Sequence, residues 1–155
     1  MSPTLLALSL CAAAAALEGL AAGGGVKARF AELRLPPFSP PLAVWIGIGV
    51  GYYVICFFIL SRLLAAPPAS ATTGRLALGL VCLLMLANAA WGLLFFRRRD
   101  LRLSFLAFPP YAVLTLALGT TLWVVDRLAA VVLLPYLLYL IYATWWGYRL
   151  WRLNA

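Results

Sequence analysis

The sequence contains no histidine and only four acidic residues among 155. Without histidine the chain cannot build a Ser–His–Asp triad, a histidine-ligated zinc site or a histidine-ligated haem iron. The acidic residues are too few and too scattered for a metal cage or a catalytic carboxyl pair; they are Glu18, Glu32, Asp100 and Asp126. We therefore expect no metal site, no required cofactor and no acid–base catalytic residues.

Cysteine is also scarce. Each of the three cysteines lies inside an apolar run and none belongs to a C-x-x-C motif; they are Cys11, Cys56 and Cys82. Isolated cysteines in such runs are typical of small hydrophobic side chains that are buried or face lipid. The sequence does not indicate a disulfide framework.

Charged residues make up only 10% of the chain, whereas hydrophobic residues make up 66%. A soluble domain has about 45–50% apolar and about 25% charged residues. A chain of this length and composition has too few polar residues to cover the surface of a soluble globule. Its high hydrophobicity also excludes a disordered chain. The composition predicts an integral membrane protein.

Five apolar stretches are long enough to cross a bilayer, since a hydrocarbon core of about 30 Å needs roughly 20 helical residues. They are residues 4–22, 41–60, 75–96, 103–125 and 128–148. The runs are continuous and rich in Leu and Ala, which favours helices over the alternating strands of a membrane barrel. No basic side chain precedes the first stretch, so we interpret it as a span and not as a signal peptide. The sequence predicts one all-α domain over 1–155, a bundle of five transmembrane helices.

Basic residues gather at the ends of these spans. Nine of the twelve lie in 23–40, in 97–102 or after 148, and the other three lie on the opposite side; these three are Arg62, Arg75 and Arg127. The positive-inside rule then places the first and third loops and the C-terminus in the cytoplasm. A net charge of +8 distributed in this way indicates contact with anionic membrane lipids and not with nucleic acid.

Small residues recur every four positions in the first two spans. Residues 15, 19 and 23 are Ala, Gly and Gly, and Gly47 and Gly51 form a G-x-x-x-G motif. A face of small residues lets two helix backbones approach closely. The motif fits either helix packing inside one bundle or the interface of a homodimer.

Two span ends carry recognisable signals. Four prolines between residues 36 and 41 predict a stiff segment that starts the second span. Loop 1, about 23–40, can therefore lie over one end of the bundle as a lid, formed by Pro36, Phe38, Pro40 and Pro41. Asp126 directly precedes the fifth span, where it is expected to cap the helix N-terminus.

The third and fifth spans contain the polar and aromatic residues that break the apolar pattern. Asn88, Trp91 and Phe95 follow i, i+3, i+7 and share a helix face. An amide in hydrocarbon needs a partner, which is either a neighbouring helix or a ligand that stacks on the same aromatic face. In the fifth span Pro135 removes a backbone hydrogen bond and bends the helix. This bend is expected to open space beside the deep tyrosines Tyr136 and Tyr139, while Trp145, Trp146, Tyr148 and Trp151 fit an interfacial belt.

These features together resemble the TspO/MBR family, the tryptophan-rich sensory proteins and translocator proteins. The resemblance rests on ordered blocks spread over about 5–154. They are L-P-x-F-x-P-P at 35–41, Tyr53, N-x-x-W-x-x-x-F-F at 88–96, A-x-x-x-L-x-P-Y at 129–136 and R-L-N at 152–154. The chain departs from the family pattern where Gly49 and Tyr139 replace tryptophans, Leu84 replaces a glutamine and Gly147 replaces an asparagine.

The resemblance implies a five-helix fold with a pocket, closed by loop 1, for porphyrin, haem or sterol-like ligands. It also implies a bacterial membrane or the mitochondrial outer membrane as the location. We expect the ligand to contact Trp45, Tyr53, Asn88, Trp91, Phe95, Tyr136, Tyr139, Ala143 and Trp146. Any haem would lack a histidine ligand and be held by shape and stacking.

Three functions remain open at this point. The first is a receptor, sensor or transporter for flat apolar ligands. The second is light-dependent tetrapyrrole degradation, an activity in which the family tryptophans replaced here by Gly49 and Tyr139 are implicated; Trp45 lies one turn before Gly49. The third is a structural or partner-binding membrane protein.

Overall fold

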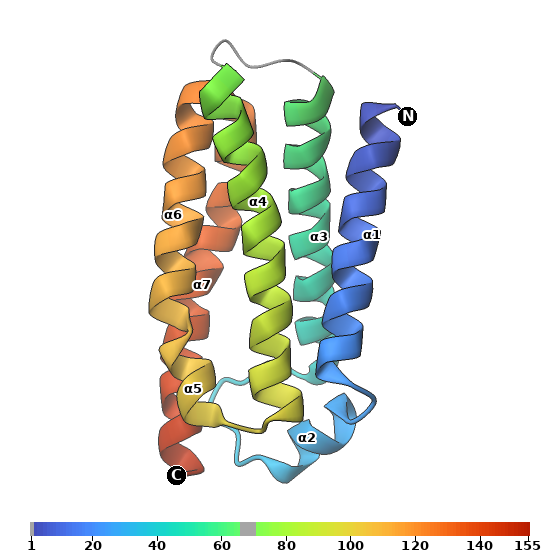
Figure 1. The fold of residues 1–155 in the computed structure, drawn as a ribbon. Helices are drawn as coiled ribbons and strands as arrows, with labels where there is room; N and C mark the ends of the chain where they lie inside the picture. Colours follow the sequence, from blue (N-terminus) through green and yellow to red (C-terminus); the bar gives the residue numbers. More distant parts are fainter. Residues whose placement is uncertain (1, 66–70) are drawn as a thin grey trace.

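The computed structural model describes residues 2–65 and 71–155 and shows a bundle of five long helices (Figure 1). Helices α1 and α3 are followed by α4, which continues into the π-helical turn η1, and then by α5–α6 and α7. The bounds are α1 Pro3–Ala22, α3 Leu42–Ala65, α4 Ala71–Gly92, η1 Leu93–Arg97, α5 Leu101–Leu106, α6 Phe108–Val125 and α7 Arg127–Leu153. Five segments are long and apolar enough to span a membrane, and this confirms the predicted fold class.

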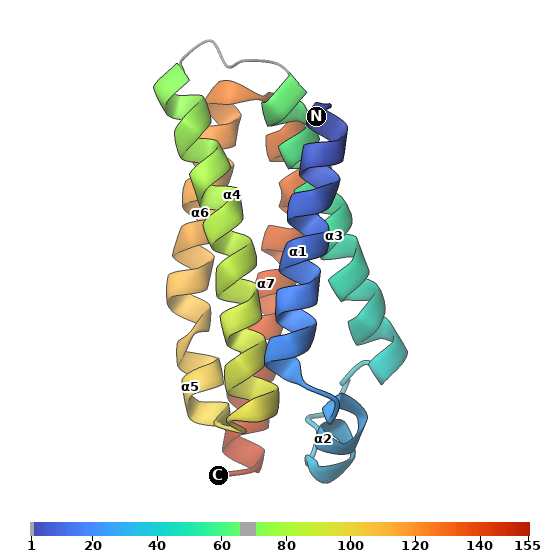
Figure 2. The same cartoon turned by 45° about the vertical axis from the view of Figure 1, so that its right-hand side comes forward.

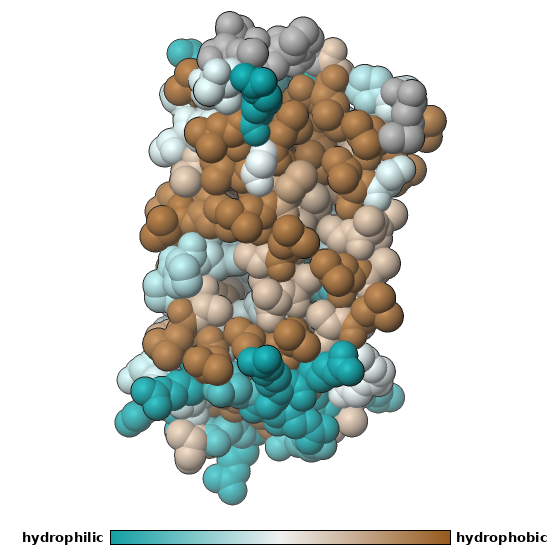
Figure 3. Space-filling view, viewed as in Figure 1, coloured by the Kyte–Doolittle hydropathy of each residue, from teal (hydrophilic) through white to brown (hydrophobic). Residues whose placement is uncertain are grey.

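Consecutive long helices run in opposite directions, whereas α1 and α4 run parallel to each other (Figures 1 and 2). Helix α1 lies against α3 and α4, and α6 lies between α4 and α7 (Figures 1 and 2). The N-terminus lies at one end of the bundle, whereas the short helix α2 (Val26–Glu32), α5 and the C-terminus lie at the other. The second end carries a hydrophilic band below a broad apolar belt (Figure 3). Nine of the twelve basic residues belong to this end, which we call the basic end.

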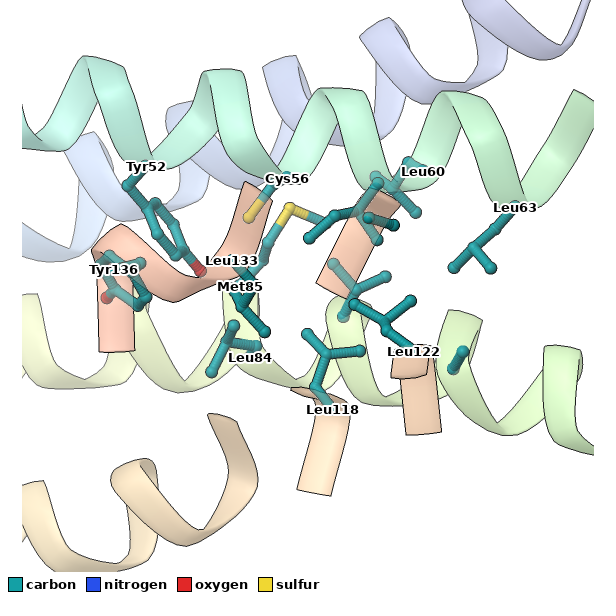
Figure 4. Close-up of a cluster of buried hydrophobic side chains, with 14 of the residues drawn as sticks. Tyr52, Cys56, Leu60, Leu63, Leu84, Met85, Leu118, Leu122, Leu133 and Tyr136 are labelled. Atoms are coloured by element: carbon teal, nitrogen blue, oxygen red, sulfur yellow. The ribbon is translucent and has the colours of Figure 1, made fainter. Parts of the chain in front are cut away.

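The close-packed core fills the half of the bundle away from the basic end. It is built from the C-terminal half of α3, the N-terminal half of α4 and the facing turns of α6 and α7. Leu60, Leu84 and Leu118 are fully buried there, and Leu63 and Leu122 extend the cluster (Figure 4). Tyr52 and Tyr136 lie together at one end of the cluster, with ring centroids 4.9 Å apart.

The structure differs from the sequence-based boundaries at several places. The fourth span is broken at Ala107 into α5 and α6, because Pro109 and Pro110 fit only the first turn of a new helix. Loop 1 contains the helix α2, which apolar periodicity did not reveal. Helix α7 runs to Leu153 and not to 148. The predicted second connection, 61–74, is shortened by helix at both ends, and its residues 66–70 lie outside the described ranges.

The small-residue stripes do not pack inside this bundle. A Cβ added at Gly19, Gly23, Gly47 or Gly51 would meet no other heavy atom of the described chain within 4 Å. The interpretation of these glycines as internal packing residues is therefore wrong. The homodimer stays a prediction.

Asp126 caps α7 as predicted. Its Oδ1 accepts hydrogen bonds from the backbone N–H groups of Leu128 (3.1 Å) and Ala129 (3.2 Å), and its Oδ2 accepts one from Arg62 at the end of α3. Partial burial of Asp126 opposes its ionisation. The hydrogen bonds outweigh this effect, so the pKa of Asp126 lies below its ordinary value.

Replacing Asp126 tests this cap. Asp126→Ala removes both the cap and the ion pair and should lower the free energy of unfolding by about 1–2 kcal/mol. Asp126→Asn keeps a capping oxygen, so its free energy of unfolding should lie between that of Asp126→Ala and that of the original chain. Because the folded-state pKa is depressed, the charge stabilises the fold above the ordinary aspartate pKa of about 3.9 and stops doing so as the pH falls through the folded-state value.

The measurement is thermal unfolding in detergent at several pH values. The difference between the original chain and Asp126→Asn should be present at neutral pH and should close in acid. A difference that grows in acid would contradict the assigned role.

Candidate functional site

Two adjoining cavities occupy the half of the bundle nearest the basic end. The inner cavity has a volume of about 420 Å³ and lies among α4, α6 and α7. The side cavity has a volume of about 340 Å³ and lies toward α1 and α3. Both volumes fall in the range of small-molecule sites, about 300–1,000 Å³. The two cavities share six wall residues, which are Trp45, Asn88, Trp91, Tyr136, Tyr139 and Trp146.

The inner cavity is lined mainly by apolar and aromatic side chains. Phe108 and Tyr111 reach it from the first turn of α6, just beyond the break at Ala107. Tyr111 and Tyr136 join their hydroxyl groups at 2.7 Å, which satisfies both without water. The result is a mainly apolar chamber with flat ring surfaces, suited to a flat apolar ligand.

The side cavity exists because small residues line it. Gly19 on α1 and Gly49 on α3 both face it, and a Cβ at either position would meet no heavy atom within 4 Å. Gly49 is the position at which the family pattern expects a tryptophan. The absence of that ring leaves open space between α1 and α3.

A single carboxyl group connects three helices beside the side cavity. Glu18 Oε2 on α1 accepts a hydrogen bond from the Tyr53 hydroxyl on α3 (2.7 Å) and another from Asn88 Nδ2 on α4 (2.9 Å). Asn88 therefore has a helix partner, as one of the two sequence interpretations expected. Glu18 also lines the side cavity, and sequence reasoning did not assign it to the site.

An aromatic cluster separates the cavities from the basic end. Trp146 is 2% exposed and packs on Trp45 with ring centroids 4.6 Å apart. Phe95 is equally buried and stacks behind Trp91 at 4.9 Å and an interplanar angle of 16°. Trp91 Nε1 donates to Ser104 O (3.2 Å), which ties α4 to α5 and fixes the indole plane.

Loop 1 is fastened to α7 over this cluster. Trp146 Nε1 donates to Ser39 Oγ (2.8 Å), and the Tyr142 hydroxyl donates to Phe38 O (3.1 Å). Asn154 binds the loop backbone just after α2, because its Oδ1 accepts from Arg34 N and its Nδ2 donates to Arg34 O, both at 2.9 Å. These contacts hold residues 34–39 across the ends of the helices.

The predicted lid residues do not touch the cavities. Pro36 is buried, whereas Phe38 has a positive φ of 63° and is 89% exposed. Pro40 and Pro41 precede α3 and line neither cavity. The loop closes the bundle through its backbone and Ser39, which sequence reasoning did not single out.

The predicted ligand-contacting residues divide into two groups. Seven of the nine line the inner cavity; they are Trp45, Asn88, Trp91, Tyr136, Tyr139, Ala143 and Trp146. Phe95 lies behind Trp91 and supports the wall without lining either cavity. Tyr53 faces Glu18 and acts through that hydrogen bond.

Ion pairs join α2 to the turn after η1. Glu32 accepts a hydrogen bond from Arg99 Nη1 (3.2 Å) and lies 3.8 Å from Arg29, whose Nη2 donates to Arg99 O at 3.2 Å. Burial lowers the pKa of Arg29, and the nearby Arg99 adds to this effect. The ion pairs hold α2 beneath the aromatic cluster.

The fold and the cavities define a multi-pass integral membrane protein with an aromatic chamber between its helices. The family model described as TspO/MBR family matches residues 7–152, nearly the whole chain. The chain belongs to the TspO/MBR family, and this confirms the resemblance seen in the sequence. Membership supports a membrane sensor or binding protein in general. The comparison with curated proteins finds no match.

Gly147 allows Phe108 to close one wall of the inner cavity. A Cβ at position 147 would lie 2.6 Å from Phe108 Cε2, so Gly147→Ala forces the ring to move. Overpacking of this kind typically costs about 1–3 kcal/mol, which exceeds the helix propensity gained by alanine. We expect a lower melting temperature in detergent.

Gly119→Ala is the matched control, because its Cβ would meet Leu133 and Leu137 at an ordinary 3.7 Å. This variant should melt no lower than the original chain. Equal melting temperatures for the two variants would contradict the close contact at Gly147.

Removing the Ser39 hydroxyl tests the fastening of loop 1. Ser39→Ala leaves Trp146 Nε1 without its acceptor, a loss of about 1–3 kcal/mol for a buried donor. Hydrogen exchange measured by mass spectrometry should quicken across residues 34–41. Ser9→Ala serves as the control, because that exposed hydroxyl donates to Leu5 O of its own helix. Unchanged hydrogen exchange of the loop in Ser39→Ala would show that Ser39 does not fasten loop 1.

Proposed function

We propose that this protein is a membrane receptor, sensor or transporter that binds a porphyrin, haem or a similar flat apolar molecule in the inner cavity. The observation that carries this proposal is the aromatic wall shared by α4 and α7. Trp91 and Tyr139 present ring surfaces to the same chamber, and Ala143 leaves room between them. Stacking on such surfaces contributes beyond simple burial of area.

The hydrogen bonds of the wall favour a preformed site. Trp91 is held by Ser104, and Trp146 is held by Ser39. A ligand that meets already oriented rings loses little free energy to ordering them. The propionate groups of a porphyrin would extend toward the basic end, which attracts anionic groups together with anionic membrane lipids.

The topology proposed here places the basic end in the cytoplasm and the N-terminus on the opposite side, by the positive-inside rule. A ligand then enters from the bilayer or from the cytoplasmic side, past loop 1. Tetrapyrrole and membrane lipids are the proposed partners, and no nucleic acid is expected.

Light-dependent degradation is less well supported by the site. Gly49 and Tyr139 stand where the resemblance expects the tryptophans of that activity. Trp45 lines both cavities with its ring centroid 6.4 Å from that of Tyr139. Illumination of the bound porphyrin would detect such chemistry as protein-dependent loss of the Soret band to a new product.

Titration with protoporphyrin IX tests the proposal. The Soret band should shift saturably in detergent or nanodiscs, and Trp91→Ala should weaken binding about tenfold through loss of one stacking surface. Trp123→Ala is the control, because Trp123 is 54% exposed on α6 and lines neither cavity. Absence of saturable binding, or equal affinities in the two variants, would overturn the proposal, provided that both variants elute and fold as the original chain does.

A further inference from the structure

The side cavity contains an acidic group that binding of a flat apolar ligand does not use. Glu18 lies on α1 within a span and faces this cavity. A carboxyl group inside a membrane-spanning bundle is costly unless it is paired, and ionisable residues in such places mark ligand or ion sites. The partners of Glu18 therefore decide what the cavity can bind.

The partners that the structure gives Glu18 are neutral. Tyr53 and Asn88 both donate to Oε2, and among the described residues no hydrogen bond is made by Oε1. The ion pairs in the described part of the chain join Arg29 and Arg99 to Glu32, and Arg62 to Asp126. Glu18 is thus fixed in place by two donors, with one oxygen left for a further partner.

The walls around Glu18 are aromatic. Rings from α2, α3, α4, η1 and α7 line the same space; they are Phe30, Trp45, Tyr52, Trp91, Phe96, Tyr136, Tyr139 and Trp146. The face of an aromatic ring attracts a cation, more strongly where water is excluded. A carboxyl oxygen and several ring faces around one apolar chamber favour an organic cation over a neutral or anionic molecule.

The space for such a molecule comes from glycine. Gly49 and Gly19 line the side cavity from the neighbouring helices α3 and α1, and an added Cβ at either position would enter open space. A larger side chain at position 49 would occupy the chamber from α3. The glycine at position 49 therefore gives the side cavity its space, and this cavity adjoins the inner one without reaching α6.

We propose that the side cavity binds lipophilic amines in their protonated form, with the ammonium group at Glu18 and the apolar body against the aromatic walls. A volume of about 340 Å³ accommodates a compact body of one or two rings. This binding goes beyond the tetrapyrrole proposal and does not depend on it, because Glu18 lines the side cavity and not the inner one.

Two fluorescent probes of matched shape test the proposal. 2-(Aminomethyl)naphthalene carries a positive charge at pH 7, whereas 2-(hydroxymethyl)naphthalene is neutral. Both are titrated into the full chain in nanodiscs of zwitterionic lipid, and binding to empty nanodiscs is subtracted. The ammonium probe should bind at least about tenfold more tightly than the alcohol, as expected for a carboxylate partner in an apolar site. Equal affinities of the two probes for the original chain would overturn the proposal.

Glu18→Gln keeps the shape of the side chain and both hydrogen-bond donors but removes the charge. The preference for the ammonium probe should disappear in this variant. Glu32→Gln removes one acidic charge at the basic end, outside both cavities, and should retain the preference. A preference that survives Glu18→Gln, or that is lost equally in Glu32→Gln, would overturn the proposal.

A second pair of variants does not alter the carboxyl group. Gly49→Trp fills the side cavity and should abolish binding of both probes. Gly47→Trp places the same ring on an exposed turn of α3 that lines neither cavity, and should leave binding unchanged. Probe binding that resists Gly49→Trp would place the amine elsewhere and refute the assignment.

Protoporphyrin titration of the same samples separates the two proposals. Glu18→Gln should lose the amine preference while the Soret shift persists. A chain that binds porphyrin but shows no amine preference refutes only the side-cavity proposal. A chain that shows the amine preference without a Soret shift refutes only the tetrapyrrole proposal.

Discussion

Two hydrogen bonds to Glu18 hold three helices together at the level where the bundle changes from filled to hollow. On one side of Tyr53 the turns of α3 carry Cys56, Leu60 and Leu63 into a close-packed core. On the other side α3 carries Gly49 and Trp45 along open space. Apolar packing alone gives no reason for helices to stay apart around a cavity, since dispersion contacts favour closing it. Fixed polar contacts between α1, α3 and α4, together with large rings that cannot interpenetrate, keep the hollow half open.

The hollow half is closed at its end by groups that belong to different parts of the chain. Trp146 packs on Trp45 and donates its N–H to Ser39, so one side chain of α7 closes the chamber and holds loop 1. Asn154, the C-cap residue of α7 eight positions later, binds the backbone of the loop at Arg34. The C-terminal R-L-N block of the sequence thus has a structural role: its asparagine fastens loop 1 from the last turn of α7.

Much of the architecture could be predicted from the sequence because it depends on periodic apolar runs. Five spans, the cap at Asp126 and the inward position of Asn88 and Trp91 follow from run length, capping chemistry and helical spacing. The break at Ala107 was missed because Pro109 and Pro110 do not interrupt hydropathy. The helix α2 is short and lies outside any apolar run.

The partners of Glu18 could not be predicted in the same way. Tyr53 and Asn88 lie 35 and 70 residues beyond Glu18 in the sequence. A single acidic residue near the end of an apolar run gives no periodic signal that indicates its neighbours. Only the packing of α1 against α3 and α4 brings the three side chains together. The position of Phe95 behind Trp91 has a related cause: the π-helical turn η1 begins at Leu93, so the spacing from Asn88 no longer follows the α-helical period.

Trp45 on α3 forms part of the wall that the two cavities share. Where the family pattern has a tryptophan, this chain has Gly49, and Trp45 one turn away packs on Trp146 between the chambers. Trp45 thus supplies a ring one turn nearer the basic end than position 49, and Gly49 leaves space beside Glu18. Because Trp91, Tyr139 and Trp146 form walls of both cavities, a ligand that reorients any of them in one cavity alters the surface offered by the other. If both cavities bind ligands as proposed, these shared rings would couple them, and the coupling would depend on how firmly Ser104 and Ser39 hold the indoles in place.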